Sequence, residues 1–171
     1  MYVFIEGMYS MADMLVKLYN LKSDENFSDD LLKQGVQIKR ALAPDRRSIL
    51  QFVKENFEEN YVDECKYAFT NNPITCYIAT KNKKVIGFAC YEATAKNYFG
   101  PTGVQESERH KGIGTVLLNK CLMSMWEMGY GYAIIGWPTK SAISFYEKTV
   151  QAQLIEDSFP GIYKRMIEFD E

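Results

Sequence analysis

The sequence predicts a single mixed α/β domain, and three observations support this fold class. The chain has 171 residues, which is enough for one domain with a sizeable core. Its hydrophobic patterns follow the order strand, two helices, three strands, helix, strand, helix, two strands. A loop with two glycines, residues 109–115, follows a predicted strand and opens a predicted helix. Open α/β sheets bind their ligands at such a position.

The first half of the chain predicts strands and helices separated by one polar segment. Alternating apolar residues predict a strand at 15–21, at an edge of the sheet, and the polar, acidic segment 22–30 predicts a loop. A strand is predicted at 36–41. Pro44 and Asp45 then open a helix that continues to about Phe57, and a shorter helix is predicted at 61–69.

The second half predicts a hairpin, a long helix and a terminal strand pair. Strands at 75–80 and 85–93 are joined by the polar turn 81–84. In the next strand, 97–105, Pro101 cannot donate to a ladder, so we expect a bulge near residues 100–103. The remaining predicted elements are a helix from Ile113, a strand at 132–136, a helix at 141–149 and a strand pair within 153–169.

Composition excludes several classes of protein. Apolar residues make up 47% of the chain, charged residues 25%, and the net charge is −2, so no basic surface for nucleic acid or an anionic membrane is expected. No apolar run is long enough to span a bilayer, and the first residues lack a basic signal-peptide start. The four cysteines form no C-x-x-C pair and only one histidine is present. We therefore expect free thiols in a reducing cytoplasm and no metal.

The loop at 109–115 has the properties of a phosphate site. Glycine lets the backbone approach a ligand closely, and the first-turn N–H groups of a helix are unpaired and lie at the positive end of its dipole. The third glycine of a dinucleotide fingerprint is replaced by Leu117, and no Gly-Lys-Ser/Thr occurs. The alternative is that both glycines only shape a surface turn. The candidate contacts are Arg109, His110, Lys111, Gly112, Ile113, Gly114 and Thr115.

Two spaced patterns resemble the signatures of the GNAT acyltransferase superfamily. Arg109-x-x-Gly112-x-Gly114 is similar to its coenzyme-A pyrophosphate loop, and Ala142-x-x-Phe145-Tyr146 is similar to its later helix. The resemblance implies the GNAT fold: a central, mostly antiparallel sheet with splayed fourth and fifth strands, flanked by helices. It places the acetyltransferase domain at 35–171 and leaves 1–34 as an N-terminal extension with a possible edge strand.

The resemblance also implies roles for individual residues. Acetyl-CoA would lie along Gly103 and Val104, with the acetyl oxygen held by a backbone N–H near Val104 and no metal required. Tyr146 would give its proton to the coenzyme-A sulfur; the alternative is a core tyrosine that only packs. Family members often have asparagine where Thr139 stands, and Thr139 could equally be a helix N-cap.

The general base and the acceptor site are less well defined by sequence. The strand at 97–105 has no carboxylate, so Glu92 is the nearest candidate base, and a strand-end charge or a water chain are the alternatives. The acceptor pocket is expected to include Phe57, Tyr61, Glu64, Trp137 and Phe159. Acidic residues near the first helix pair would attract a cationic amine, although such charges are often only solvated.

We therefore expect an N-acetyltransferase that moves an acetyl group from acetyl-CoA to a primary amine of a small molecule or peptide by direct attack. One alternative is a non-catalytic coenzyme-A-binding sensor or interaction module. Another is an acyltransferase with a different donor or acceptor. The protein is expected to be cytoplasmic, monomeric or homodimeric, and independent of nucleic acid and membranes.

Overall fold

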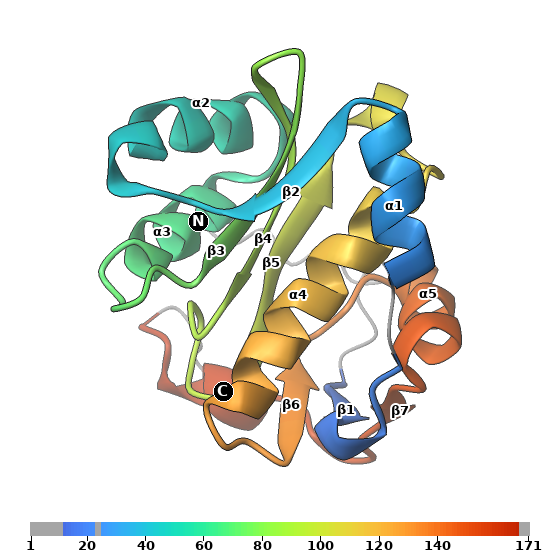
Figure 1. Cartoon of the computed structure of the whole chain (residues 1–171). Helices are drawn as coiled ribbons and strands as arrows, with labels where there is room; N and C mark the ends of the chain where they lie inside the picture. The colour runs from blue at the N-terminus through green and yellow to red at the C-terminus, as the bar shows by residue number, and fades with distance from the viewer. Residues whose placement is uncertain (1–11, 23–24, 168–171) are drawn as a thin grey trace.

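A computed structural model describes residues 12–22 and 25–167 and confirms the mixed α/β class. One seven-stranded sheet has the strand order β2-β3-β4-β5-β6-β1-β7. Neighbouring strands are antiparallel except for β5 and β6, which are parallel. The sheet forms the centre of the molecule, with helices packed around it (Figure 1). None of the described helices is long and apolar enough to cross a membrane.

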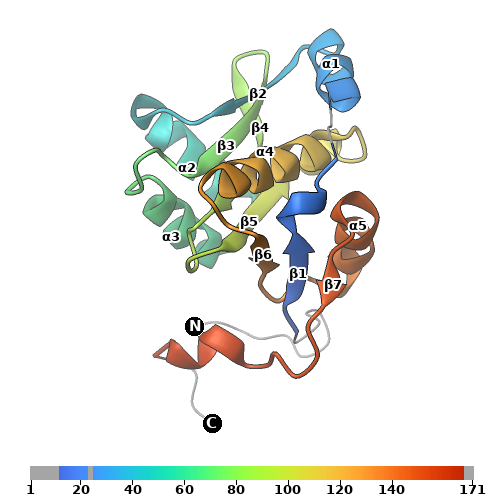
Figure 2. The ribbon, with the colours of Figure 1, turned by 60° about the horizontal axis from the view of Figure 1, so that its bottom comes forward.

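The first described strand lies inside the sheet and not at its edge, contrary to the prediction. β1 (Met14–Lys17) pairs with β6 (Tyr132–Ile135) on one side and β7 (Gln153–Leu154) on the other. Figure 2 shows β1 between these two strands. The side chains of Met14 and Val16 are fully buried. Their burial fixes the register of β1, because a one-residue slip would expose both.

The loop predicted at 22–30 is wrong, because most of it belongs to the helix α1 (Glu25–Lys33). Leu31 is fully buried in the core beneath this helix. α1 packs against β2 (Val36–Arg40) and α4 (Ile113–Glu127). Leu31 directly follows the polar, acidic segment, and one buried leucine is a weak periodic signal. Packing against β2 and α4 therefore decides that this segment is helical.

The middle of the chain confirms the predicted helix pair and hairpin. α2 (Arg46–Asn56) and α3 (Glu59–Ala68) precede β3 (Cys76–Lys81) and β4 (Lys84–Tyr91). Alternation along β3 and β4 divides the core into two layers. Ile78 and Phe88 pack with α2 and α3, whereas Ala79 and Ala89 pack with α4 on the opposite face.

The predicted terminal strand pair is wrong in the part of the tail that the structure describes. Strand pairing ends with the two residues of β7, and residues Gly161–Arg165 form the short 3-10 helix η4. Tyr163 of η4 packs on Trp137, with ring centroids 4.2 Å apart. This aromatic contact holds the tail across the end of β6 and not beside a partner strand.

Candidate active site

The parallel strands β5 (Tyr98–Val104) and β6 separate soon after they meet. Only Tyr98 and Phe99 of β5 pair with β6, opposite Ile134 and Ile135. The register of β5 against β4 shifts between Phe99 and Thr102, so the predicted bulge is confirmed. Because β5 stays paired with β4 as far as Val104, the gap opens on its β6 side.

Backbone groups of β5 point into this gap. The Gln105 N–H donates to the Ile86 carbonyl of β4 at 2.9 Å, and Gly103 lies opposite Phe88. Peptide groups alternate sides along an antiparallel strand. Gly103 therefore faces β4, whereas the peptide groups of Thr102 and Val104 turn toward β6. The Val104 carbonyl accepts a hydrogen bond from Arg109, but neither Thr102 nor Val104 pairs with a strand on this side, so an extended ligand could join the edge here.

The glycine loop connects this edge to α4. Gly112 is in the left-handed region, with φ 86°, and directly precedes the first helical residue. The first bond of the α4 ladder runs from the Val116 N–H to the Gly112 carbonyl at 3.2 Å. The N–H groups of residues 113–115 lie before it and have no intrahelical partner. They can donate to an anion.

The cations of the loop already make contacts. Arg109 Nε donates to the Val104 carbonyl at 3.1 Å, which ties the loop to the end of β5. Lys111 Nζ donates to Glu108 Oε2 at 2.8 Å and to the Ser107 carbonyl. The ion pair with Lys111 lowers the pKa of Glu108. His110 is exposed, with φ 62°.

Gly114 brings the two sequence patterns together. A Cβ at Gly114 would lie 3.8 Å from the Phe145 ring and 3.9 Å from Val104. Phe145 belongs to α5 (Lys140–Val150), so β5, α4 and α5 meet at this glycine. Thr139 directly precedes α5, but its hydroxyl pairs with Ser141 and does not cap the helix.

Tyr146 of α5 lies beside the point where the strands separate. Its side chain is 6% exposed, and its ring meets the ring of Phe99 edge-on with 6.2 Å between centroids. Burial raises the pKa of Tyr146 well above its usual range, so the phenol stays protonated. Among the described residues, no hydrogen-bond partner occupies its hydroxyl. A protonated phenol beside the separating strands is chemically able to donate a proton.

The second wall of the site is aromatic. Trp137 stacks on Phe159, with centroids 5.2 Å apart, and also packs against Tyr163. Asp13 is buried next to them. Its carboxylate accepts hydrogen bonds from the Tyr98 hydroxyl at 3.1 Å and from the backbone N–H of Trp137 at 3.4 Å. Sequence analysis missed Asp13, Tyr98 and Tyr163, because no motif connects these three separate segments.

Three of the predicted acceptor residues lie at the end of α2 and on α3: Phe57, Tyr61 and Glu64. Phe57, at the end of α2, stacks on Tyr61 of α3 with centroids 6.2 Å apart and covers Gly103 of β5. Glu64 accepts a hydrogen bond from Thr94. Burial raises the pKa of Glu64 despite this bond. Burial and, after it, the charges of Asp13 and Glu64 raise the pKa of Tyr163.

Glu92 organises a turn through its carboxylate. It is 3% exposed; its carboxylate accepts hydrogen bonds from Lys96 Nζ at 2.8 Å and from the Asn97 N–H at 2.7 Å. Burial alone would raise the pKa of Glu92, but these bonds, with Tyr130, lower it overall. A stabilised carboxylate is a weak proton acceptor, so the predicted base lies in an environment suited to structure.

The separated parallel strands, the glycine loop at a helix start and the buried tyrosine form one candidate site. The model of the acetyltransferase (GNAT) family matches residues 38–150. The chain belongs to the GNAT family.

Solved structures show the same fold at low sequence identity. A GCN5-related glucosamine N-acetyltransferase region of a fungal multi-domain β-N-acetylglucosaminidase is 14% identical with a TM-score of 0.69, and the match covers 88% of this chain and 20% of that chain. A GCN5-related N-acetyltransferase from Sphaerobacter thermophilus is 14% identical with a TM-score of 0.64, covering 84% of this chain and 48% of that one. The match thus spans a fifth to a half of these two proteins.

A third similar structure is a GNAT family acetyltransferase from Brucella melitensis, solved in complex with acetyl-CoA. It is 15% identical with a TM-score of 0.51, and the match covers 70% of this chain and 86% of that chain. No curated protein sequence matches at a significant level.

Proposed function

We propose that this protein transfers an acetyl group from acetyl-CoA to a primary amine of a small molecule or peptide by direct attack. The observation that carries the proposal is the position of Tyr146. A buried, protonated phenol lies beside the separation of β5 and β6, with the glycine loop at the far end of the same strand. A thioester held along β5 would have its sulfur within the region of this phenol.

The donor would bind from the loop toward Tyr146. The first-turn N–H groups of α4, with Arg109, His110 and Lys111 around them, suit a pyrophosphate. Lys111 would exchange Glu108 for a phosphate oxygen. The peptide groups of Thr102 and Val104 suit the amides of the pantetheine arm, and Thr139, at the start of α5, offers a hydroxyl to the same arm. The Val104 N–H is then the donor to the acetyl oxygen, where negative charge develops.

The reaction needs one nitrogen–carbon bond to form and one carbon–sulfur bond to break. The amine attacks the thioester carbonyl, the carbon–sulfur bond breaks, and Tyr146 gives its proton to the departing sulfur. The ammonium group of the acceptor loses one proton to solvent before the attack, its nitrogen loses a second one after it, and solvent returns a proton to Tyr146. Glu92 takes no part, because its carboxylate is already stabilised by Lys96 and Asn97.

The acceptor would enter between α3 and the aromatic wall. Glu64 offers a carboxylate for a cationic amine, and Tyr61 and Phe57 would line the same side of the acceptor site. Trp137 and Phe159 offer stacked rings on the other side. We also infer that residues 35–171 form the catalytic domain and that the extension 1–34 contributes β1 and the buried Asp13.

The test is turnover with acetyl-CoA and a panel of amino sugars, diamines, aminoglycosides and peptides. Release of free coenzyme-A thiol is followed, and each product is checked by mass for an added acetyl group. The control without amine measures simple hydrolysis of the thioester. We expect amine-dependent thiol release with at least one cationic acceptor. Tight calorimetric binding of acetyl-CoA without turnover across the panel would instead indicate a coenzyme-A sensor.

A further inference from the structure

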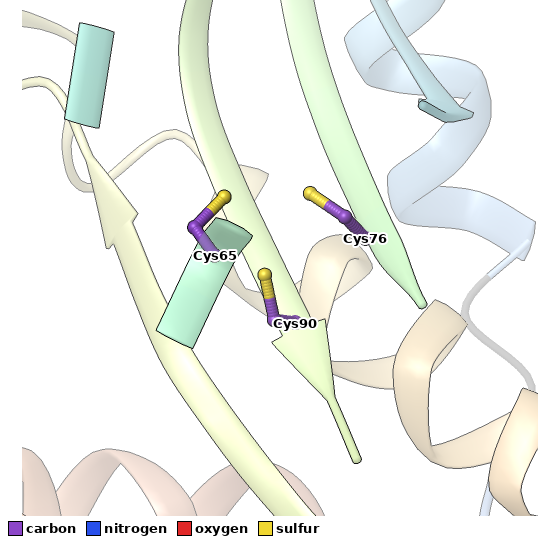
Figure 3. Close-up of side chains that lie close together, drawn as sticks. All are labelled: Cys65, Cys76 and Cys90. Atoms are coloured by element: carbon purple, nitrogen blue, oxygen red, sulfur yellow. The ribbon is translucent and has the colours of Figure 1, made fainter. Parts of the chain in front are cut away.

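Three buried cysteines on three different elements meet on the α2–α3 face of the sheet. Cys65 lies on α3, Cys76 on β3 and Cys90 on β4, and all three side chains are 0% exposed. Their sulfur atoms all lie within 4.8 Å of one another. Figure 3 shows these atoms converging on a common space between the helix and the two strands. Cys76 and Cys90 are direct cross-strand partners in the β3–β4 ladder.

The spacing of the sulfur atoms fits three bonds to one ion. Metal–sulfur bonds to a d10 ion are about 2.3 Å long, so three sulfurs around a trigonal centre stand about 4.0 Å apart. The observed separations need a contraction of less than about 1 Å to reach this geometry. Thiolate sulfur is a soft ligand and selects soft ions.

The surroundings favour an ion that needs only three ligands. Within residues 12–22 and 25–167, no histidine, carboxylate or further cysteine joins this group of three. Around it are apolar side chains, including Ile49, Phe52 and Val62. A structural zinc ion requires a fourth ligand, and the apolar side chains around the three cysteines offer none.

We propose that Cys65, Cys76 and Cys90 form a binding site for one soft, three-coordinate metal ion of the Cu(I) type. Binding replaces thiol protons by metal–sulfur bonds, releases those protons to solvent and changes no oxidation state. The ion would join α3 to β3 and β4. Since Glu64 directly precedes Cys65, the same ion would fix the part of α3 that faces the acceptor side.

The first test uses the full chain, freed of metal and kept reduced without added thiols. Four free thiols are counted after denaturation to establish the starting state. Cu(I) is then titrated without oxygen in the presence of a competing chelator. We expect one equivalent to bind and the melting temperature to rise. X-ray absorption at the copper edge should show three sulfur neighbours.

The matched variants are Cys65→Ser and Cys121→Ser. Cys121 is equally buried but lies on α4, where its thiol donates to the Ala89 carbonyl. Cys65→Ser should lose tight uptake by at least 100-fold, and Cys121→Ser should retain it. If Cys65→Ser does not fold, this comparison is replaced by alkylation of the wild-type protein, with and without Cu(I), at a denaturant concentration that exposes the buried thiols of the metal-free protein. Peptide mapping should then find residues 65, 76 and 90 protected equally.

Four results would overturn the proposal. They are no uptake by the folded wild-type protein, equal losses in the two variants, tighter binding of Zn(II) than of Cu(I), and a native Cys76–Cys90 disulfide in place of free thiols. The site is independent of the proposed acetyl transfer, because these readouts require no substrate.

Discussion

The ring of Phe99 meets the ring of Tyr146 edge-on, with 6.2 Å between their centroids. Phe99 is the last residue of β5 that pairs with β6. The contact therefore places the phenol at the vertex of the gap between the two strands. It also buries the tyrosine, and this burial raises its pKa.

Replacing Tyr146 by phenylalanine should remove the proton donor while keeping the ring contact. We expect kcat to fall by about 100-fold or more, in the range typical of a lost general acid. The KM for acetyl-CoA should change little, because the hydroxyl acts on the departing sulfur. Steady-state thiol release measures both constants. Tyr67→Phe is the control, because Tyr67 is exposed on α3; unchanged kcat in Tyr146→Phe would remove the acid role.

Gly112→Ala should weaken the binding of acetyl-CoA. The residue has φ 86°, and a Cβ there would lie 3.2 Å from the Phe27 ring, so both the backbone and α1 must adjust. Gly129→Ala is the matched control, since it imposes the same kind of strain at the other end of α4, at φ 99° in open space. Both variants should lose about 1 kcal/mol of stability.

Calorimetry with acetyl-CoA compares the binding affinities of the two glycine variants. Affinity should fall several-fold or more in Gly112→Ala and stay near the wild-type value in Gly129→Ala. Equal affinities in the two variants would show that the start of α4 does not hold the donor.

Glu64→Gln should raise the KM for a cationic amine and leave the KM for acetyl-CoA unchanged. Asp63→Asn is the control, because Asp63 is an exposed neighbour that pairs with Lys66 on the solvent side. The pKa of Glu64 is raised above its usual 4.5 by burial. As the pH falls, the wild-type Glu64 carboxylate therefore becomes protonated at a higher pH than an exposed carboxylate does. The KM for the amine should begin to rise at that higher pH. A pH profile that is identical in Glu64→Gln would contradict this role.

Glu92→Gln should destabilise the protein but spare catalysis. Loss of a buried charged hydrogen bond costs about 1–3 kcal/mol in the free energy of unfolding at pH 7. The pKa of Glu92 is lowered in the folded state. Glu92 therefore stabilises the folded protein at pH values above the pKa that it has in the unfolded chain, and this stabilisation disappears as the pH falls through the folded-state pKa.

Urea unfolding at a series of pH values measures this contribution. The difference between wild type and Glu92→Gln should shrink as the pH drops below 4.5. A collapse of kcat in well-folded Glu92→Gln would instead restore Glu92 as the general base.

Local signals predicted most of the elements that carry the proposed donor site. Gly112 and Gly114 marked the start of α4, and Pro101 marked the bulge in β5, because glycine and proline restrict the backbone wherever they occur. These expectations needed no knowledge of distant contacts. The loop over 22–30 failed as a prediction because a single buried leucine, Leu31, supports the helix there.

The acceptor side could be predicted only in fragments. Trp137 and Phe159 were identified separately, but their stacking depends on Tyr163, which the prediction had placed in a strand. Asp13 carried no signal at all, because its partners Tyr98 and Trp137 are distant in sequence.

The family, the order of most elements and the glycine loop that starts α4 followed from the sequence alone, since backbone preferences and apolar periodicity are properties of neighbouring residues. Only the tertiary structure decided that β1 lies inside the sheet and that Glu92 holds a turn. It alone brought Cys65, Cys76 and Cys90 within 4.8 Å. The spacing of the three cysteines along the chain matches no ligand motif. The distance between them in space is set by how α3 packs on β3 and β4.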